Sequence, residues 1–291
     1  LDLFMSLGSL AFSAFYSLKT VDEWIATINA NTNGAGKVGF RASKLKFGGD
    51  SVTSSTSTPT PRLATRIGEQ SLTAAQTAVN FKPGTLVNTT DATHFGIEKN
   101  QYLFFVVDQR QSAALTDTGL AQDTNTMLLT RDGEFHWGDQ EPDGFYYLRD
   151  VNGNYVVNAG VGGFLYTSGA LPGELVRTND PMLFDQMMTT RVLTPGLLRA
   201  LEPAMLEFSD QDGSSYFKYP GNASVQGDLA NPGFPIDGSN GILHNYSLEG
   251  SNSSLTETVP ELALAQKVYS AIATVIKVAN ANLDEVLRLI K

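Results

Sequence analysis

The chain has 291 residues, of which 42% are hydrophobic and 17% are charged, so it is long enough to form one large or two modest folded domains. Its formal net charge of −10 argues against a nucleic-acid partner, because phosphate binding needs clustered Lys and Arg side chains. Cysteine is absent, which excludes disulfides, thiolate metal sites and a cysteine nucleophile and agrees with an exported chain.

An apolar repeat with heptad spacing occupies the N-terminal end. Its residues recur at steps of four and three, the spacing that lines one face of an α-helix, and they predict a helix from about Ser6 to Asn29. The first fifteen residues lack the basic cluster of a secretory signal and are shorter than the roughly 20 residues that span a bilayer. We expect them to begin this helix, with a signal or anchor segment as the alternative. The repeat consists of Leu7, Ala11, Ala14, Leu18, Val21, Ile25 and Ile28.

Residues 31–71 are predicted to form turns and an extended arm. Asn and Gly are frequent after the first helix and favour the positive φ values that end helices. The run from Gly34 to Gly39 matches G-x-G-x-x-G, but a dinucleotide-binding loop leaves a strand, whereas this run leaves a helix. We interpret it as a turn. Residues 51–62, rich in Ser, Thr and Pro, predict a linker or an arm that orders against neighbouring subunits.

Residues 72–257 have the pattern of a β-rich domain. Short apolar runs are separated by Asp-Gly and Asn-Gly pairs, which favour tight turns; examples are YLFFVVD, TMLLTRDGEFHW, GFYYLRD and GNYVVNAG. A short helix is predicted at about residues 181–188. The run that begins at Asp150 starts like a calcium loop, but Tyr155 takes the position of the required Gly, so a hairpin turn explains the run better.

A longer heptad repeat occupies residues 258–291. Thr258 and Glu261 have the spacing of a capping box, and Pro260 is tolerated in a first helical turn. The predicted fold class is therefore α+β: paired N- and C-terminal coiled-coil-like helices, residues 1–30 and 258–291, with a predominantly β middle domain. The C-terminal repeat consists of Leu262, Ala265, Tyr269, Ile272, Ile276, Ala279, Leu283, Val286 and Ile290.

Patterns that indicate catalysis or ligand binding are sparse. His94, His136 and His244 are isolated from one another and do not have the spacing of metal ligands. Acidic pairs such as Asp210 and Asp212 fit surface turns, which favour Asp for its hydrogen bonds to the backbone. We predict a non-enzymatic protein that uses no cofactor or metal and has no small-molecule substrate.

Several sequence segments resemble the bacterial flagellar rod and hook proteins, also called the hook-basal-body family. Leu248 to Asn252, with the later QKVYSA run, is similar to that family's LE-x-SN signature and Q-R-A-Y helix. The stretch from Phe81 to Thr89, followed by FGIEKNQYLFFVVD, is similar to its G-x-L-x-x-T and A-I-x-G-x-G-F-F segments. Thr130 to Phe135 and then residues 150–157 resemble its Y-T-R-D-G-x-F and D-x-x-G-x-x-V pair.

The segment after the first helix matches the family pattern less closely. It keeps Asn31, Gly39, Phe40 and the basic Arg41, but it has Gly34 and Lys37 where the family usually has Asn and Thr. This difference leaves open a relative that serves another extracellular filament.

The resemblance implies a structural subunit that polymerises with itself into a helical tubular filament. The resemblance implies that this filament is a rod-like or hook-like part of the bacterial flagellum and that its subunit is exported to the flagellum or cell surface. In such a filament the terminal helices would be innermost and the β domain outside. Other flagellar axial proteins would adjoin its ends. The alternatives are a non-flagellar surface fibril for gliding or adhesion, and a soluble β-rich binding or hydrolytic domain with a helical dimerisation hairpin.

Both apolar repeats need cover, and we predict that their residues are self-assembly contacts. Phe12, Phe15 and Trp24 lie partly off the N-terminal repeat and would be exposed on a monomer, so we assign them to the same contacts. The alternative for the repeats is an intramolecular helical hairpin that covers both.

Overall fold

The computed structural model describes residues 2–49, 71–109, 126–157, 176–183, 197–200, 202–209, 215–220, 225–227 and 243–289. The chain divides into two compact units. The helical unit comprises residues 1–33, 43–79 and 254–291, and the β unit comprises residues 34–42 and 80–253.

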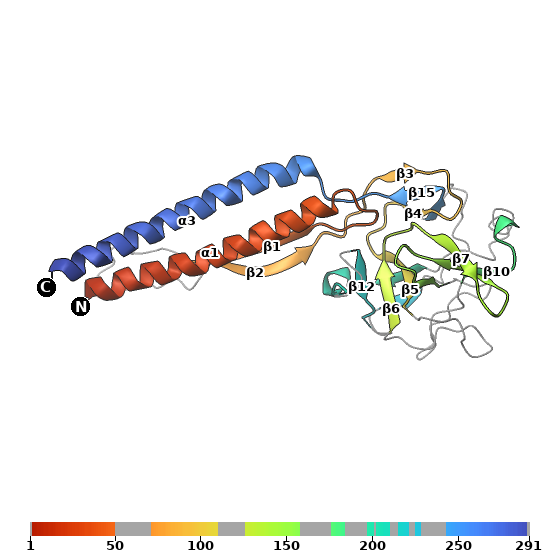
Figure 1. The fold of residues 1–291 in the computed structure, drawn as a ribbon, viewed down its shortest axis with the longest axis horizontal. Helices are drawn as coiled ribbons and strands as arrows, with labels where there is room; N and C mark the ends of the chain where they lie inside the picture. The colour runs from red at the N-terminus through yellow and green to blue at the C-terminus, as the bar shows by residue number, and fades with distance from the viewer. Residues whose placement is uncertain are drawn as a thin grey trace, which may run out of the picture. The chain divides into compact units, whose positions relative to one another are not determined.

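Two long helices and one pair of strands make up the helical unit. Helix α1 (Asp2–Gly34) and helix α3 (Leu255–Leu289) lie side by side and run in opposite directions (Figure 1). Strands β1 (Ser43–Gly49) and β2 (Leu72–Val79) pair in antiparallel register from Ser43 opposite Val79 to Gly49 opposite Leu72.

Polar side chains fasten α1 to the two strands. Ser17 Oγ accepts a hydrogen bond from the backbone N–H of Leu72 at 2.9 Å, and Thr20 Oγ1 donates to the Leu72 carbonyl at 3.0 Å. Further along α1, the Asn31 side chain donates to the Ser43 carbonyl at 2.6 Å and accepts from the Ser43 N–H at 2.8 Å. These polar groups are buried but paired, as buried polar groups must be. One side of α1 is therefore covered by strands.

The apolar core of the helical unit gathers around Trp24. Its ring meets Phe47 of β1 edge to face, with centroids 5.1 Å apart, and its Nε1 donates to Glu261 Oε1 of α3 at 2.9 Å. A buried Trp usually finds such a partner for its N–H group. The cluster consists of Val21, Trp24, Ile28 and Ala265, with Ile25, Leu45, Leu72, Leu262, Val268 and Ile272 packed against it.

The predicted pairing of the helices as a coiled coil is wrong. A coiled coil buries the large residues of both heptad repeats against the facing helix along their length. Among the described side chains of the α3 repeat, the fully buried members are Ala265 and Ala279, whereas Tyr269 is exposed. The physical reason is that α1 divides its apolar face between α3 and the strands. The described residues have one N-terminal and one C-terminal α-helix and a mostly β middle region.

Both helices extend beyond their predicted limits. Helix α3 begins at Leu255 because the Ser254 carbonyl accepts from the N–H groups of Glu257 and Thr258, both at 3.0 Å. Thr258 consequently lies within the first turn, and Glu261 binds Trp24, so the predicted capping box does not form. Helix α1 runs from residue 2 to residue 34 and exceeds the predicted span at both ends.

A nine-stranded antiparallel sheet dominates the described part of the β unit. The order is β10-β8-β9-β5-β11-β13, with β6 also paired to β5, β12 to β6 and β7 to β8. The strands are β5 (Leu103–Asp108), β6 (Met127–Thr130), β7 (His136–Gln140), β8 (Tyr146–Arg149), β9 (Tyr155–Val156), β10 (Arg177–Thr178), β11 (Leu197–Ala200), β12 (Tyr216–Lys218) and β13 (Val225–Gly227).

Two short strand pairs complete the β unit. They join β4 (Phe95–Ile97) to β14 (Leu243–Asn245) and β3 (Leu86–Asn88) to β15 (Ser247–Glu249). The strands predicted from YLFFVVD, TMLLTRDGEFHW, GFYYLRD and GNYVVNAG are confirmed as β5 to β9. The predicted short helix is a 3₁₀ helix at Pro181–Leu183, with residues 184–188 outside the described part, where residues 51–62 also lie.

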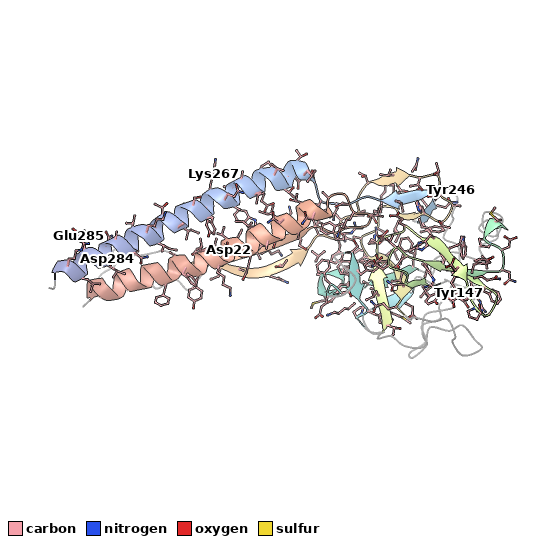
Figure 2. The ribbon with its side chains drawn as sticks, viewed as in Figure 1. Asp22, Tyr147, Tyr246, Lys267, Asp284 and Glu285 are labelled. Carbon is pink, nitrogen blue, oxygen red and sulfur yellow. The ribbon has the colours of Figure 1, made fainter. Side chains whose placement is uncertain are left out.

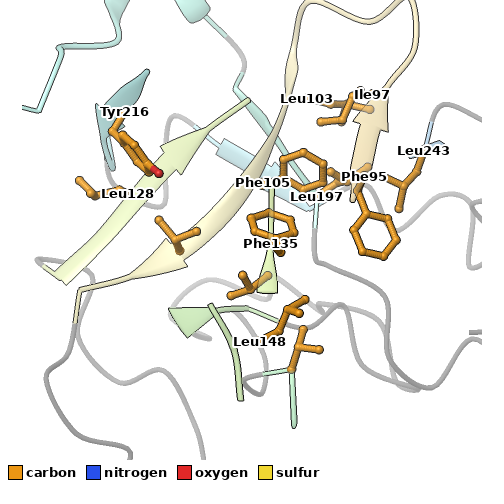
Figure 3. Packing of buried hydrophobic residues seen from close by; sticks show 13 residues of the cluster. Phe95, Ile97, Leu103, Phe105, Leu128, Phe135, Leu148, Leu197, Tyr216 and Leu243 are labelled. Atoms are coloured by element: carbon orange, nitrogen blue, oxygen red, sulfur yellow. The ribbon is translucent and has the colours of Figure 1, made fainter. Parts of the chain in front are cut away.

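The core of the β unit is built around β5, whose six residues are all buried. Figure 3 shows the buried hydrophobic side chains that pack together there. Phe105 of β5 meets Phe135 edge to face with ring centroids 5.2 Å apart, and Phe135 also contacts Phe95. Aromatic pairs of this geometry add stability beyond the area they bury. The cluster consists of Phe95, Ile97, Leu103, Phe105, Val107, Leu128, Phe135, Leu148, Val156, Val176, Leu197, Tyr216 and Leu243.

A buried cluster of charges joins distant segments of the β unit. Glu249 at the end of β15 accepts from Arg41 Nη2 on Oε1 at 2.6 Å and from Arg131 Nε on Oε2 at 2.7 Å. Its Oε1 also accepts from the Gly84 N–H at 2.8 Å. All three charged side chains are almost fully buried. Two guanidinium groups therefore depend on one carboxylate for charge compensation.

Asn252 extends this connection by hydrogen bonds. Its Oδ1 accepts from the Ala42 N–H at 2.7 Å, and its Nδ2 donates to the carbonyls of Asn80 and Lys82. The backbone adds a bond from Gly39 N–H to the Glu249 carbonyl at 2.7 Å. The segment that follows α1 and the segment that precedes α3 are thus bound to each other.

Replacing Glu249→Gln should destabilise the β unit by about 3–5 kcal/mol, because it leaves two buried guanidinium charges without a carboxylate. Urea denaturation followed by Trp137 fluorescence in a Trp24→Phe background measures the change. Glu207→Gln, at an exposed ion pair with Lys218, is the control and should change stability little. A Glu249→Gln variant as stable as this control would contradict the role given to the cluster.

Candidate functional site

An aromatic patch projects from the outer side of α1. Phe12, Phe15 and Tyr16 are 70%, 61% and 59% exposed, and the rings of Phe15 and Tyr16 meet edge to face with centroids 6.5 Å apart. Phe12 precedes the buried Val21 by nine residues, or two and a half turns, which places it on the opposite side of the helix. We call these three residues the aromatic patch. Large apolar groups gathered in this way mark interaction surfaces.

A second apolar line with heptad spacing runs along α3. Leu264, Val275 and Val278 are 54%, 42% and 54% exposed, Ala271 is exposed, and Val268 is half-buried. These five residues step by 4, 3, 4 and 3, and each one precedes a member of the first repeat. At about 100° of rotation per residue, they form a line about 100° around the helix from that repeat. We call this line the outer stripe and the first repeat of α3 the inner seam.

Charged residues border these apolar surfaces, among them the exposed Lys19, four residues after Phe15. Asp22 of α1 and Lys267, Asp284 and Glu285 of α3 project from the helices and are all exposed (Figure 2). The five positions of the outer stripe itself carry no charge. The stripe is therefore suited to apolar packing rather than to binding an ion.

The structure places the predicted self-assembly residues in different surroundings. Phe12 and Phe15 are exposed as expected for contacts with another chain, whereas Trp24 packs inside the helical unit. The larger inner-seam residues are half-buried or exposed: Leu262, Tyr269, Ile272, Ile276 and Leu283. On α1, Ala14, Val21 and Ile28 are buried, and Leu18 and Ile25 are half-buried. Leu7, Ala11 and Val286 belong to the helices by backbone, and Ile290 lies outside the described residues.

Sequence reasoning missed the outer stripe, although its signal was present. The stripe has the same alternation of steps as the inner seam, and each of its residues directly precedes a residue of that seam. Once one heptad repeat accounts for a helix, a second line of Val and Ala beside it is easily overlooked. The structure separates them because the inner seam contains the buried Ala265 and Ala279, while the stripe is largely uncovered.

The T-R-D-G segment has a structural place in the β unit. Burial lowers the pKa of Arg131 to about 10, although the nearby Glu249 carboxylate opposes this shift. The side chain of Arg131 therefore remains charged at neutral pH. The pKa of the neighbouring Asp132 is raised from 3.8 to about 7, mainly by burial and also by the nearby Glu134 and Asp150 carboxylates, against a hydrogen bond from the Glu134 N–H. Asp132 is the described acid whose protonation state is most sensitive near neutral pH.

The other sequence motifs form turns. Helix α1 ends at Gly34, where the Lys37 N–H donates to the Gly34 carbonyl at 3.1 Å, and Gly39 has a φ of 65°, which favours glycine. The turn predicted at G-x-G-x-x-G is thus confirmed. At Asp150, the carboxylate accepts from the N–H groups of Asn152 and Asn154 within the turn between β8 and β9. This confirms the predicted hairpin turn.

A hollow on the surface of the β unit brings together two of the histidines. It is lined by His94, His136, Asp91, Glu134 and Trp137, among others. His94 Nδ1 lies 3.1 Å from Thr89 Oγ1, and its Nε2 lies 3.6 Å from Asp91 Oδ2. Nowhere in the described part of the chain do three or more His, Cys, Asp or Glu side chains gather in a way that could hold a metal ion. The described residues of the hollow therefore form no such metal-binding cluster.

Comparisons with known proteins identify no relative: no protein-family model and no curated protein sequence matches the chain. Among the described residues, one helical segment, Leu255–Glu285, is long and apolar enough to cross a membrane, by length and composition alone. Lys267 and Lys277 lie within it, and charged groups are unfavourable at the centre of a membrane span.

Raising the pH from about 4 to about 7 should lower the stability of the β unit. Between these values folded Asp132 holds a proton that the unfolded chain has released, so the unfolded state becomes favoured as pH rises. The raised pKa of Asp150 acts in the same direction. Asp132→Asn keeps the hydrogen-bond acceptor and should reduce the difference between the melting temperatures at pH 5 and pH 8. An unchanged difference, equal to that of an Asp139→Asn control, would contradict this assignment.

Proposed function

We propose that the chain is a non-enzymatic structural subunit that polymerises with copies of itself through the helical unit. The observation that carries this proposal is the presence of two uncovered apolar surfaces, the aromatic patch and the outer stripe, on helices that already pack by other faces. A protein that remained monomeric would expose both surfaces to water at a cost in solubility. Contact between copies covers them without a change in fold.

The polar groups of the described β unit support a structural role. Glu249, Arg41 and Arg131 pair with one another in the interior, where the buried Arg41 Nε has no hydrogen-bond partner among the described residues, and the Asn252 side chain bonds to backbone groups. The Asp150 carboxylate accepts a hydrogen bond from the Asn154 N–H within its own turn. These interactions maintain the fold.

The motif resemblance indicates which assembly such a subunit would build. Leu248 to Asn252, Thr130 to Phe135 and the stretch beginning at Phe81 resemble segments of flagellar rod and hook proteins, so the proposed assembly is a rod-like or hook-like part of the bacterial flagellum. Other axial proteins would then adjoin its ends. The protein would act mechanically, outside the cytoplasm.

A second candidate is a non-flagellar surface fibril. Gly34 and Lys37 depart from the family pattern, and no family model matches the chain; both observations favour this candidate. The same two apolar surfaces would serve either assembly. Expression of the protein by a cell that has no flagellar basal body would distinguish the fibril from the flagellar rod or hook.

Val275→Glu should raise the concentration needed for assembly by about tenfold or more, because a carboxylate on the outer stripe must be desolvated without a partner. Sedimentation velocity over a range of concentrations measures the change. Thr274→Glu is the matched control: it introduces the same charge one residue away, about 100° around α3 and off the stripe. Equal effects of the two substitutions would contradict a role for the stripe.

A further inference from the structure

We infer that the outer stripe of one copy binds the aromatic patch of a second copy of this chain, at the same level along the helices. This inference rests on the proposed function and specifies the contact through which polymerisation proceeds. It assigns a partner to each of the two exposed surfaces of the helical unit.

The two surfaces cannot meet within one chain. Val21 of α1 and Ala265 of α3 belong to the same buried cluster, so α1 turns its Val21 side toward α3. The aromatic patch lies about 180° around α1 from that side. The α3 helix that covers the patch must therefore come from another copy.

The patch of one copy and the stripe of the next lie at the same position along the helix axes when the two copies are not shifted along those axes. Trp24 lies opposite Glu261 in the antiparallel helices of one chain, joined by a 2.9 Å hydrogen bond. Counting nine residues back along α1 gives Phe15, and nine on along α3 gives Ser270, next to Ala271. The patch is thus level with the middle of the stripe, since Ala271 is the third of its five residues.

The two surfaces also match in side-chain size. Ala271 has a small side chain at the middle of the stripe, and Val268 and Val275 on either side of it are short and stiff. Phe12, Phe15 and Tyr16 are bulky and project outward. Packing aromatic side chains against a stripe of small residues lets two helices approach closely while burying large rings.

The contact repeats from copy to copy: with no axial offset it follows a ring, and a small offset along the helices turns that ring into a helical array. Each copy presents one stripe and one patch, which are different surfaces, so the contact is heterologous and every interior copy makes it twice. Because the stripe and the inner seam are about 100° apart on α3, successive helices turn rather than form a flat layer. With side chains of 150–250 Å² that are about 60% exposed, the patch supplies roughly 300–450 Å², below the roughly 800 Å² per partner of a stable interface. Assembly consequently depends on repetition of the contact.

The absence of cysteine from the sequence permits a direct test by disulfide cross-linking of the full chain. A chain carrying Phe15→Cys is mixed with a chain of different mass carrying Ala271→Cys, and the mixture is oxidised under conditions in which sedimentation velocity shows assembly. Mixed disulfides should exceed by about tenfold those formed by Phe15→Cys with Gln266→Cys, because Gln266 lies far around α3 from the stripe and disulfides need Cα atoms within about 7 Å. The pair Phe12→Cys and Val275→Cys is a second test if Phe15→Cys does not fold.

The outcomes separate this inference from the proposed function. Assembly with the expected mixed disulfides supports both. Assembly without them, or with disulfides only between two Ala271→Cys chains, overturns the inference and leaves polymerisation standing. A chain that stays monomeric at every concentration, including one that instead binds phosphatidylcholine vesicles through α3, overturns both.

Discussion

The ion cluster at Glu249 is the interaction on which the connectivity of the structure depends. One carboxylate, at the end of β15, compensates two arginines that are 208 and 118 residues away and also accepts a hydrogen bond from the backbone N–H of Gly84. Together with Asn252, it binds the segment that leaves α1 to the segment that enters α3. Gly84, Arg131, Glu249 and Asn252, which belong to segments that resemble flagellar rod and hook motifs, lie in this network. Their role here is to hold the fold, which is separate from any function that the resemblance suggests.

The helical unit is constrained differently, by an excess of apolar surface. Helix α1 covers one side with the strands and another with α3, and its aromatic patch lies on neither side. Helix α3 has two apolar lines, of which the inner seam contributes the buried alanines and the outer stripe remains exposed. A helix that is apolar on more than one side needs more than one neighbour. The proposal of a polymer follows from this mismatch between the apolar surface and the cover available within one chain.

The sequence predicted element types better than the packing between elements. Heptad spacing located both helices, and Asp-Gly and Asn-Gly pairs located β5 to β9, because both signals are local. Coiled-coil pairing was predicted wrongly, since nothing local shows that Ser17, Thr20 and Asn31 hold strands against α1. The predicted capping box of α3 does not form, because the helix already begins at Leu255 and Glu261 accepts a hydrogen bond from a residue 237 positions away. Of the candidate site, Phe12 and Phe15 were predicted, and the outer stripe was not.

Electron microscopy of the native protein with helical averaging tests polymerisation most directly, because it shows both whether an assembly exists and which parts of each subunit lie between neighbours. The account predicts a helical assembly in which α1 and α3 of adjacent copies are in contact and the β unit makes fewer contacts between copies. Single particles of one subunit at every protein concentration, or an assembly in which the helices of adjacent copies do not touch, would contradict it.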